Sequence, residues 1–207
     1  MGRTIEYYFT PVSPWTYLGH GRLGAIAARH GAEILCKPVD YGKIFPASGG
    51  LPLAKRPPQR QAYRLFELER WRRFLDIPLN LHPAFFPAPA ELASRLILAA
   101  PAAAQFRLAG ALLRAIWAEE RNIADEATLG RICAENELDG ARLLDVAQSP
   151  ALAERHDALT QEAVLRQVFG APTYIYRDEP FWGQDRLDFL ERALAASAKD
   201  RRNGRNG

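Results

Sequence analysis

Cysteine and histidine are scarce in this chain of 207 residues, which limits the redox and metal chemistry open to it. The two cysteines, Cys36 and Cys133, are 97 positions apart, and the chain has no C-x-x-C motif. This spacing favours two buried structural thiols over a disulfide bond. The four histidines form no H-x-x-x-H pair and have no cysteine or carboxylate at metal-ligand spacing. We therefore expect no metal site.

A long apolar run is also missing. The most apolar stretch, residues 96–104, is much too short to cross a bilayer. The first residues, MGRTIEYYF, lack the apolar segment of a signal peptide. These absences predict a cytoplasmic protein that does not bind membranes.

Excess positive charge is confined to the end of the chain. The net charge is +3 and the sequence pI about 9.0, but residues 199–207 hold four basic residues and one acidic residue. The rest of the chain has 23 basic and 23 acidic residues, which argues against a nucleic-acid partner. The tail has no apolar residue to bury, and this predicts that residues 199–207 are disordered.

The segments that are present follow an informative order. A strand is expected at residues 5–9, a helix at about 14–30 and a strand at 33–39, which together form a βαβ unit with a parallel sheet. Residues 40–58 are rich in turn signals and predict a long loop. Segments rich in alanine and leucine then predict an all-helical block, with helices at about 59–76, 89–104, 105–121, 125–137, 139–147 and 151–168.

The chain ends with two short strands, at 173–177 and 180–182, and a helix at about 185–196. Neither end of the chain supplies enough strands for a sheet, but the two ends together supply four. The fold class is therefore α/β, with one sheet domain that a helical segment splits. The expected parts are a sheet domain from residues 1–45 and 166–198, a loop and helical insertion from 46–165, and the tail.

The stretch FTPVSPWTYL, residues 9–18, places a serine at the junction between strand and helix. Ser13 and Pro14 are preferred residues for the N-cap and the first position of a helix. The same hydroxyl, with the free N–H groups and the positive end of the helix dipole, would also stabilise an anion such as a thiolate. Capping and anion binding use the same geometry, so this stretch leaves both interpretations open.

Two passages near the C-terminus have a similar double interpretation. Pro172 begins a strand, where a trans bond is the ordinary expectation; a cis bond would turn the N–H and C=O of Ala171 outward, free to pair with an extended peptide. In FWGQDR, residues 181–186, Asp185 is a good helix cap. It is also placed to hold an ammonium group beside backbone N–H groups that could hold a carboxylate.

The helix expected at 59–76 carries charges on one face. Arg60 and Glu67 are seven residues apart, with Tyr63, Arg64 and Trp71 nearby. A solvated face with salt bridges explains this pattern. The alternative is a cation and an anion that face a common ligand.

As a set, these motifs resemble the 2-hydroxychromene-2-carboxylate isomerases, which are relatives of the kappa-class glutathione transferases. The resemblance rests on SPWTYL, the passage with Tyr63, Glu67 and Arg70-Trp71, the GAPT turn and the ending FWGQDRLDFLE, in this order over residues 5 to about 195. It implies a thioredoxin-like fold with an all-helical insertion, as in DsbA and the kappa-class transferases.

The resemblance also implies how the serine is used. In redox members of the thioredoxin fold, C-x-x-C occupies the junction between strand and helix, and here Ser13-Pro14-Trp15-Thr16 stands there. The chain would then use the thiol of reduced glutathione in place of its own. Ser13 would be the catalytic residue, donating a hydrogen bond to the glutathione sulfur and lowering the thiol pKa from about 8.5.

The remaining glutathione contacts are carried over by position. Ala171, before a cis Pro172, would pair with the cysteinyl part, and Gln184 and Asp185 would hold the γ-glutamyl end. Arg60 would hold the glycyl carboxylate.

Three positions depart from the family pattern. Gly50 stands in the ligand-contacting loop where the family usually has asparagine, Arg60 where it has lysine, and Glu67 where it has aspartate. The first position loses a side chain, and the other two keep their charge but change their reach.

The implied reaction interconverts 2-hydroxychromene-2-carboxylate and trans-o-hydroxybenzylidenepyruvate, a step in bacterial naphthalene breakdown, or acts on a related aromatic catabolite. A homodimer is expected from the same resemblance. Aromatic residues are more often part of a core, but five are candidates to line a substrate pocket. These are Trp15, Tyr41, Phe85, Phe86 and Trp182.

Two other functions remain open at this point. A kappa-like glutathione transferase would consume glutathione by conjugating it to electrophiles. A non-catalytic binding protein with a thioredoxin fold would bind no glutathione, and Gly50 would then mark a decayed site.

Overall fold

The structure is a computed structural model that describes the backbone of residues 3–203 and the side chains of residues 3–197. A four-stranded mixed sheet lies at its centre, in the order β2-β1-β3-β4. The sheet joins the two ends of the chain, as the sequence predicts. β1 (Thr4–Phe9) pairs in parallel with β2 (Glu33–Pro38) and antiparallel with β3 (Thr173–Tyr176), and β3 pairs antiparallel with β4 (Glu179–Trp182).

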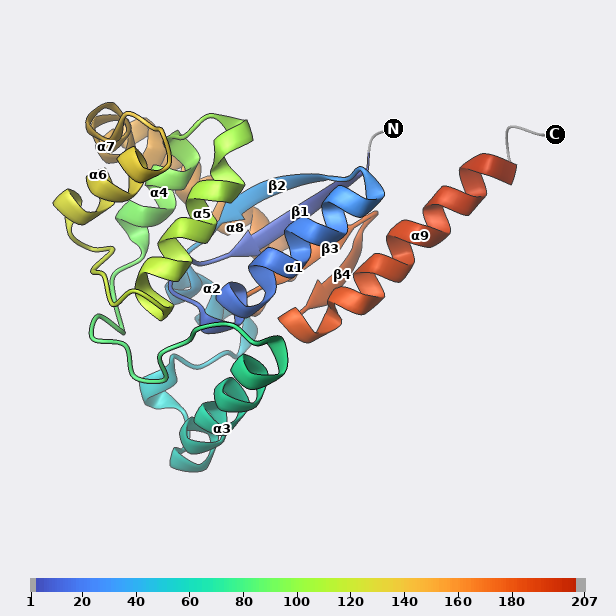
Figure 1. Ribbon diagram of the computed structural model, residues 1–207, viewed down its shortest axis with the longest axis horizontal. Coiled ribbons are helices and arrows are strands. Elements are labelled where there is room, and N and C mark those ends of the chain that lie inside the picture. Colours follow the sequence, from blue (N-terminus) through green and yellow to red (C-terminus); the bar gives the residue numbers. More distant parts are fainter. Residues whose placement is uncertain (1–2, 204–207) are drawn as a thin grey trace.

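β1 is a central strand, covered on both faces. Tyr7 and Phe9 belong to the larger hydrophobic core, together with Leu18 and Leu23 of α1 (Pro14–His30). Tyr8 points to the other face and belongs to a smaller core. This alternation is the two-residue period of a strand. In Figure 1, α1 and α9 (Leu187–Asn203) lie in front of the sheet, and α8 (Pro150–Leu165) lies behind it.

The helical insertion shares its core with the sheet. Leu112 and Trp117 of the insertion are fully buried in the same cluster as Tyr7 and Phe9 of β1. Figure 1 shows α4 to α7 gathered beside β2, while α3 stands apart from them. The insertion comprises α3 (Pro58–Leu75), α4 (Glu91–Ala99), α5 (Ala102–Trp117), α6 (Glu126–Glu135), α7 (Gly140–Gln148) and α8.

The loop predicted between residues 40 and 58 contains a helix, α2 (Tyr41–Ser48). Asp40 caps it by accepting a hydrogen bond from the Gly42 N–H, and Tyr41 and Ile44 are buried in the smaller core. A short 3₁₀ turn, η1 (Leu53–Lys55), follows. The prediction of an irregular segment was wrong for α2, because burial of its apolar face compensates for Pro46 inside the helix.

Other elements differ from the prediction at their ends. The expected helix at 89–104 ends early because Pro101 forces Ala100 into an extended conformation, and α5 begins after it. Arg177 and Asp178 both have positive φ and join β3 to β4 in a tight hairpin. α9 continues to Asn203, so residues 199–203, which were expected to be disordered, are helical. Residues 204–207 lie outside the described residues.

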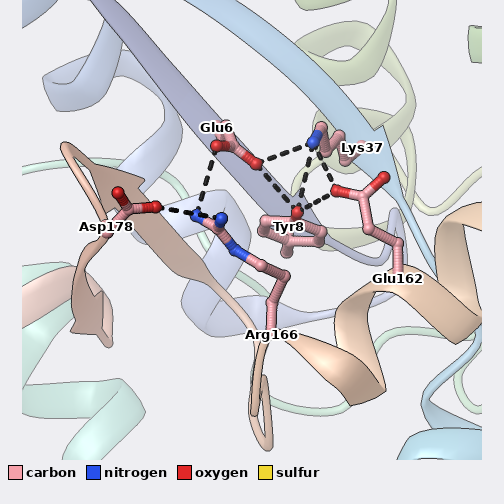
Figure 2. A network of polar contacts seen from close by, with 6 residues as sticks. All are labelled: Glu6, Tyr8, Lys37, Glu162, Arg166 and Asp178. Carbon is pink, nitrogen blue, oxygen red and sulfur yellow. Dashed lines mark hydrogen bonds and ion pairs between the residues drawn. The ribbon is translucent and has the colours of Figure 1, made fainter.

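A network of charged side chains fastens α8 to the sheet (Figure 2). The Lys37 ammonium donates to Glu6 at 2.7 Å and to Glu162 of α8 at 2.6 Å. The Tyr8 hydroxyl lies within hydrogen-bond distance of both carboxylates, and Arg166 bridges Glu6 to Asp178. We call these six residues the charge network: Glu6, Tyr8, Lys37, Glu162, Arg166 and Asp178.

The pKa values in the charge network follow from these contacts. Burial alone would raise the pKa of Glu6, but the hydrogen bonds from Lys37 and Tyr8 and the nearby positive charges lower it below its ordinary value. The same balance lowers the pKa of Glu162. Both carboxylates are therefore ionised at neutral pH, and each faces a cation.

The structure confirms the prediction that both cysteines are buried and form no disulfide bond. Cys36 and Cys133 are both buried and free. Burial raises the pKa of Cys36 to about 12 and that of Cys133 to about 11. In the described part of the chain, no helix is long and apolar enough to span a membrane.

Candidate active site

A cavity of about 520 Å³ lies where α1 begins, between α3 and the connection from β4 to α9. Its walls come from four parts of the chain: the first turn of α1, Ala171, the connection from β4 to α9, and α3 with the residues before it. The lining residues are Trp15, Arg56, Gln59, Arg60, Tyr63, Arg64, Glu67, Trp71, Ala171, Trp182, Gly183, Gln184, Asp185 and Arg186.

The first turn of α1 borders this cavity through Trp15. Ser13 is the N-cap: its backbone is extended, and its Oγ accepts a hydrogen bond from the Thr16 N–H at 3.2 Å. The capping interpretation is therefore confirmed. The Ser13 O–H finds no acceptor among the described residues, so the hydroxyl can still donate to a ligand.

A second wall is formed by Ala171 and the residues that position it. The bond between Ala171 and Pro172 is cis, and Ala171 lines the cavity. Within residues 3–203, no hydrogen bond uses the N–H or the C=O of Ala171. Gly170 is fixed by close packing, because a Cβ at this position would lie 2.2 Å from Nε1 of Trp182. The segment thus presents an unpaired peptide group beside an aromatic ring.

The connection from β4 to α9 forms the third part of the wall. Gly183 has a φ of 100°, a conformation that favours glycine, and it is followed by the 3₁₀ turn η2 (Gln184–Arg186). Gln184 is buried, and its backbone and side-chain oxygens accept hydrogen bonds from Arg22 of α1 at 3.2 and 3.0 Å. The Asp185 carboxylate is half exposed and pairs with Arg186 at 2.8 Å. This wall carries a carboxylate at the cavity surface.

The α3 side of the cavity is positively charged. Arg56, Arg60 and Arg64, which we call the cavity arginines, have no carboxylate within 4.0 Å among the residues whose side chains are described. Burial, followed by the charge of Arg60, lowers the pKa of Arg56; burial, followed by the charge of Arg56, lowers that of Arg64 to about 10. The guanidiniums thus repel one another and remain protonated at neutral pH.

Glu67 lines the same wall but is already paired. It accepts a hydrogen bond from Arg70, and this bond, against a smaller opposing effect of burial, lowers the pKa of Glu67. The salt-bridged face predicted for this helix is present, with Glu67 paired to Arg70 three residues away, but among the described side chains Arg60 takes no part in it. The cavity therefore offers unpaired cations, a peptide group and a helix N-terminus, which together suit a ligand with several anionic groups.

The comparisons with known proteins agree with this architecture. A family model for the DSBA-like thioredoxin domain matches residues 4–195. A 2-hydroxychromene-2-carboxylate isomerase from Sphingobium xenophagum is 33% identical over 94% of this chain and 99% of that protein. The chain belongs to the 2-hydroxychromene-2-carboxylate isomerases of the DSBA-like thioredoxin family.

Two further relatives extend this result. A 2-hydroxychromene-2-carboxylate isomerase from Pseudomonas sp. (strain C18) is 28% identical over 93% of this chain and 91% of that protein. The solved structure of a 2-hydroxychromene-2-carboxylate isomerase has a TM-score of 0.84 at 27% identity, covering 97% of this chain and 98% of that chain. The thioredoxin-like fold with its helical insertion, expected from the sequence, is confirmed.

Six of the twelve predicted site residues line the cavity. Trp15, Arg60, Ala171, Trp182, Gln184 and Asp185 all line it. Ser13 and Pro172 do not line it themselves, but each directly adjoins the cavity wall in the chain: Ser13 begins the helix that carries Trp15, and Pro172 follows Ala171.

Gly50 is not among the residues that line the cavity, so its predicted contact with glutathione stays a prediction. It follows α2, and its N–H donates to the Phe45 carbonyl at 3.0 Å. A Cβ at Gly50 would lie 2.5 Å from the Phe45 ring, so a larger residue here would require that ring to move.

Three predicted pocket aromatics are also outside the lining. Tyr41 is buried in the smaller core, where its hydroxyl donates to the Gly170 carbonyl at 2.9 Å. Phe86 packs on Trp117 with ring centroids 4.9 Å apart, and Phe85 is partly exposed. Tyr41 and Phe86 fill space between elements, a role that aromatic residues share with pocket walls, so residue type alone did not separate the two.

Some lining residues were given no role from the sequence. Arg64 was noted only as a neighbour of Arg60, although the four-residue spacing places both on one face of α3. Gln59 lies beside Arg60 in the chain and carried no separate signal. Arg56 precedes the helix, and only the fold brings it to the cavity.

Proposed function

We propose that this chain is a glutathione-dependent isomerase that interconverts 2-hydroxychromene-2-carboxylate and trans-o-hydroxybenzylidenepyruvate. The relationship to proteins named for this isomerase activity supports the reaction. The dependence of the reaction on glutathione is supported by the position of the chain's own thiols. Both are buried with raised pKa values, and neither lines the cavity. A thiolate at the α1 N-terminus must therefore come from outside the chain.

The groups around the cavity match those of glutathione. The Arg60 guanidinium suits its glycyl carboxylate, and the Asp185 carboxylate suits its ammonium group. The free N–H and C=O of Ala171 suit the peptide bonds of its cysteinyl part. The Ser13 hydroxyl and the N-terminus of α1 suit a negatively charged sulfur.

Bound glutathione would supply a thiolate that adds reversibly to a conjugated carbon of the substrate, so that the hemiketal ring opens, a bond rotates and the thiolate then leaves. The chain's residues support this chemistry by position and charge. Ser13 donates its hydroxyl proton in a hydrogen bond that favours the ionised sulfur, and the dipole of α1 acts in the same direction. Trp15, Trp71 and Trp182 give the cavity aromatic faces that suit a planar bicyclic substrate and exclude water.

The test is an isomerisation assay in which substrate greatly exceeds glutathione and free thiol is counted throughout. We expect product in large excess over the glutathione present, with the thiol concentration unchanged. Loss of one thiol for each product molecule would contradict the proposal and indicate a conjugating transferase. No product and no glutathione binding would indicate a non-catalytic binding protein.

A further inference from the structure

Arg64 differs from the other arginines of α3 in its surroundings. It lies on the cavity wall, and its guanidinium carbon is 5.4 Å from the centroid of the Phe86 ring and 5.8 Å from that of Trp117. Trp117 is fully buried and Phe86 packs against the larger core. Two rigid aromatic faces thus hold a planar cation at the edge of the cavity.

Arg64 also lacks a partner of its own. In the part of the chain whose side chains are described, no hydrogen bond involves its guanidinium and no carboxylate lies within 4.0 Å. In contrast, Arg70, Arg72 and Arg73 of the same helix each pair with Glu67 or Glu69.

Arg64 is half-buried, and partial removal of a cation from water without a counterion is costly; the aromatic faces offset only part of that cost. The lowered pKa of Arg64, caused mainly by burial, reflects this cost, yet at about 10 it leaves the group charged at neutral pH. Its five N–H donors suit a planar, two-oxygen anion such as a carboxylate. We therefore expect a ligand to supply the anionic partner of Arg64.

The proposed function provides two ligands with carboxylates, glutathione and the substrate. Arg60 and the Gln184–Asp185 turn are placed for the two ends of glutathione, which leaves Arg64 without a role in holding it. Trp15, Trp71 and Trp182 line the same cavity and would shield a bound aromatic acid from water. We propose that Arg64 binds the carboxylate of the substrate and thereby selects planar aromatic acids over neutral analogues, an inference that rests on the proposed function.

The experiment compares two bicyclic probes that differ only in charge, chromone-2-carboxylate and chromone-2-carboxamide. Their dissociation constants are measured by quenching of tryptophan fluorescence in the presence of saturating glutathione. We expect the wild-type protein to prefer the carboxylate by about 10- to 100-fold, the effect of a charge-assisted hydrogen bond. Arg64→Gln should lose this preference, and Arg64→Lys should keep part of it because it retains charge without the planar fork.

Two further measurements separate specificity from packing. Arg64→Gln should raise KM for the chromene carboxylate by a similar factor, with a much smaller change in kcat and unchanged glutathione affinity. Arg73→Gln is the matched control, because Arg73 lies on the same helix, pairs with Glu69 and is outside the cavity lining. This variant should behave as the wild-type protein.

The possible failures are distinguishable. Equal binding of acid and amide by a wild-type protein that is active as an isomerase would overturn the role of Arg64 alone. An unchanged preference in both Arg64 variants would do the same and leave Arg64 as a packing residue. A wild-type protein without isomerase activity would overturn the proposed function, and the inference with it.

Discussion

The charge network beneath α8 and the cavity arginines beside α3 differ in where their charges find partners. In the charge network, Lys37 and Arg166 each contact two carboxylates within the chain (Figure 2). The cavity arginines have no such contact among the described side chains, and burial, followed by the charge of a neighbouring guanidinium, lowers the pKa of Arg56 and of Arg64. Charges that are paired internally stabilise the fold, whereas charges left unpaired at a cavity are available to a ligand.

The position of each cluster supports this distinction. The charge network lies on the face of β1 that α8 covers, where Lys37 is nearly buried. The cavity arginines lie where the first turn of α1 and the C-terminal turn meet α3. The comparison predicts that substitutions in the network change stability and that substitutions at the cavity change binding.

The largest expected effect is on stability, from Lys37→Met. This change leaves Glu6 and Glu162 facing each other without their shared cation, which should lower the free energy of unfolding by about 4 kcal/mol. Urea denaturation measures the loss. Lys43→Met is the matched control, since Lys43 pairs with Asp157 at 2.7 Å on the surface and should cost below about 1 kcal/mol. Equal losses in the two variants would contradict a structural role for the network.

The next effect is a pH dependence of the stability, which distinguishes His20 in the larger core from the carboxylates of the charge network. His20 is buried between Tyr7 and Phe106; its Nε2–H donates to the Phe106 carbonyl, and Nδ1 accepts from the Tyr7 hydroxyl. Burial lowers the pKa of His20 from 6.5 to about 4, although the Phe106 contact opposes this. The unfolded chain therefore binds more protons than the folded chain in this range, and stability falls as the pH falls below 6.5.

This loss should reach about 3 kcal/mol near pH 4, with a smaller contribution from His156, whose pKa burial also lowers. The network carboxylates, with pKa values below 4.5, should add their loss only below that pH. Urea denaturation across this pH range measures both stages. His20→Asn should reduce the loss of stability between pH 6.5 and 4, and Lys37→Met should reduce the loss below pH 4.5. A wild-type stability that is constant from pH 6.5 to 4 would contradict the assignment to His20.

A smaller effect is expected at the cavity, from Arg60→Gln. Removal of one charge-assisted contact to the glycyl carboxylate should weaken glutathione binding by about 10-fold, with little change in stability. Calorimetric titration gives the affinity. Arg107→Gln, which changes an arginine on the exposed side of α5, should leave it unchanged. Identical affinities in both variants would remove Arg60 from the glutathione site.

Much of this fold could be predicted from the sequence, because its elements have strong local signals. The alternation in β1, the cap and Gly31 stop of α1, and the turn at Arg177-Asp178 all follow from residue type and spacing. α2 was missed because its stability comes from Tyr41 and Ile44 packing in the smaller core, a contact that spacing along the chain does not reveal.

The candidate site was predicted in part, for a related reason. Family motifs marked Trp15, Ala171 and Asp185, and the sheet brings these ends of the chain together. Tyr41 was a pocket candidate because an aromatic ring suits a core and a pocket equally well, and the structure places it in the smaller core. The sequence does not show that Arg64 lacks a partner. Only the fold shows that Glu67 and Glu69 pair with other arginines of α3.

The most direct test of the account concerns the sulfur at the α1 N-terminus. Reduced glutathione is titrated into the protein at neutral pH while ultraviolet difference absorption reports thiolate formation, for wild type, Ser13→Ala and Ser149→Ala. Ser149 is a matched N-cap on α8, with its Oγ 3.3 Å from the Leu152 N–H, so both variants should lose about 1 kcal/mol of stability.

We predict that wild type and Ser149→Ala form bound thiolate and that Ser13→Ala forms much less, because it lacks the hydroxyl that stabilises the ionised sulfur. Equal thiolate signals in all three proteins would contradict the role of Ser13. No thiolate in the wild-type protein would contradict the use of glutathione at this site.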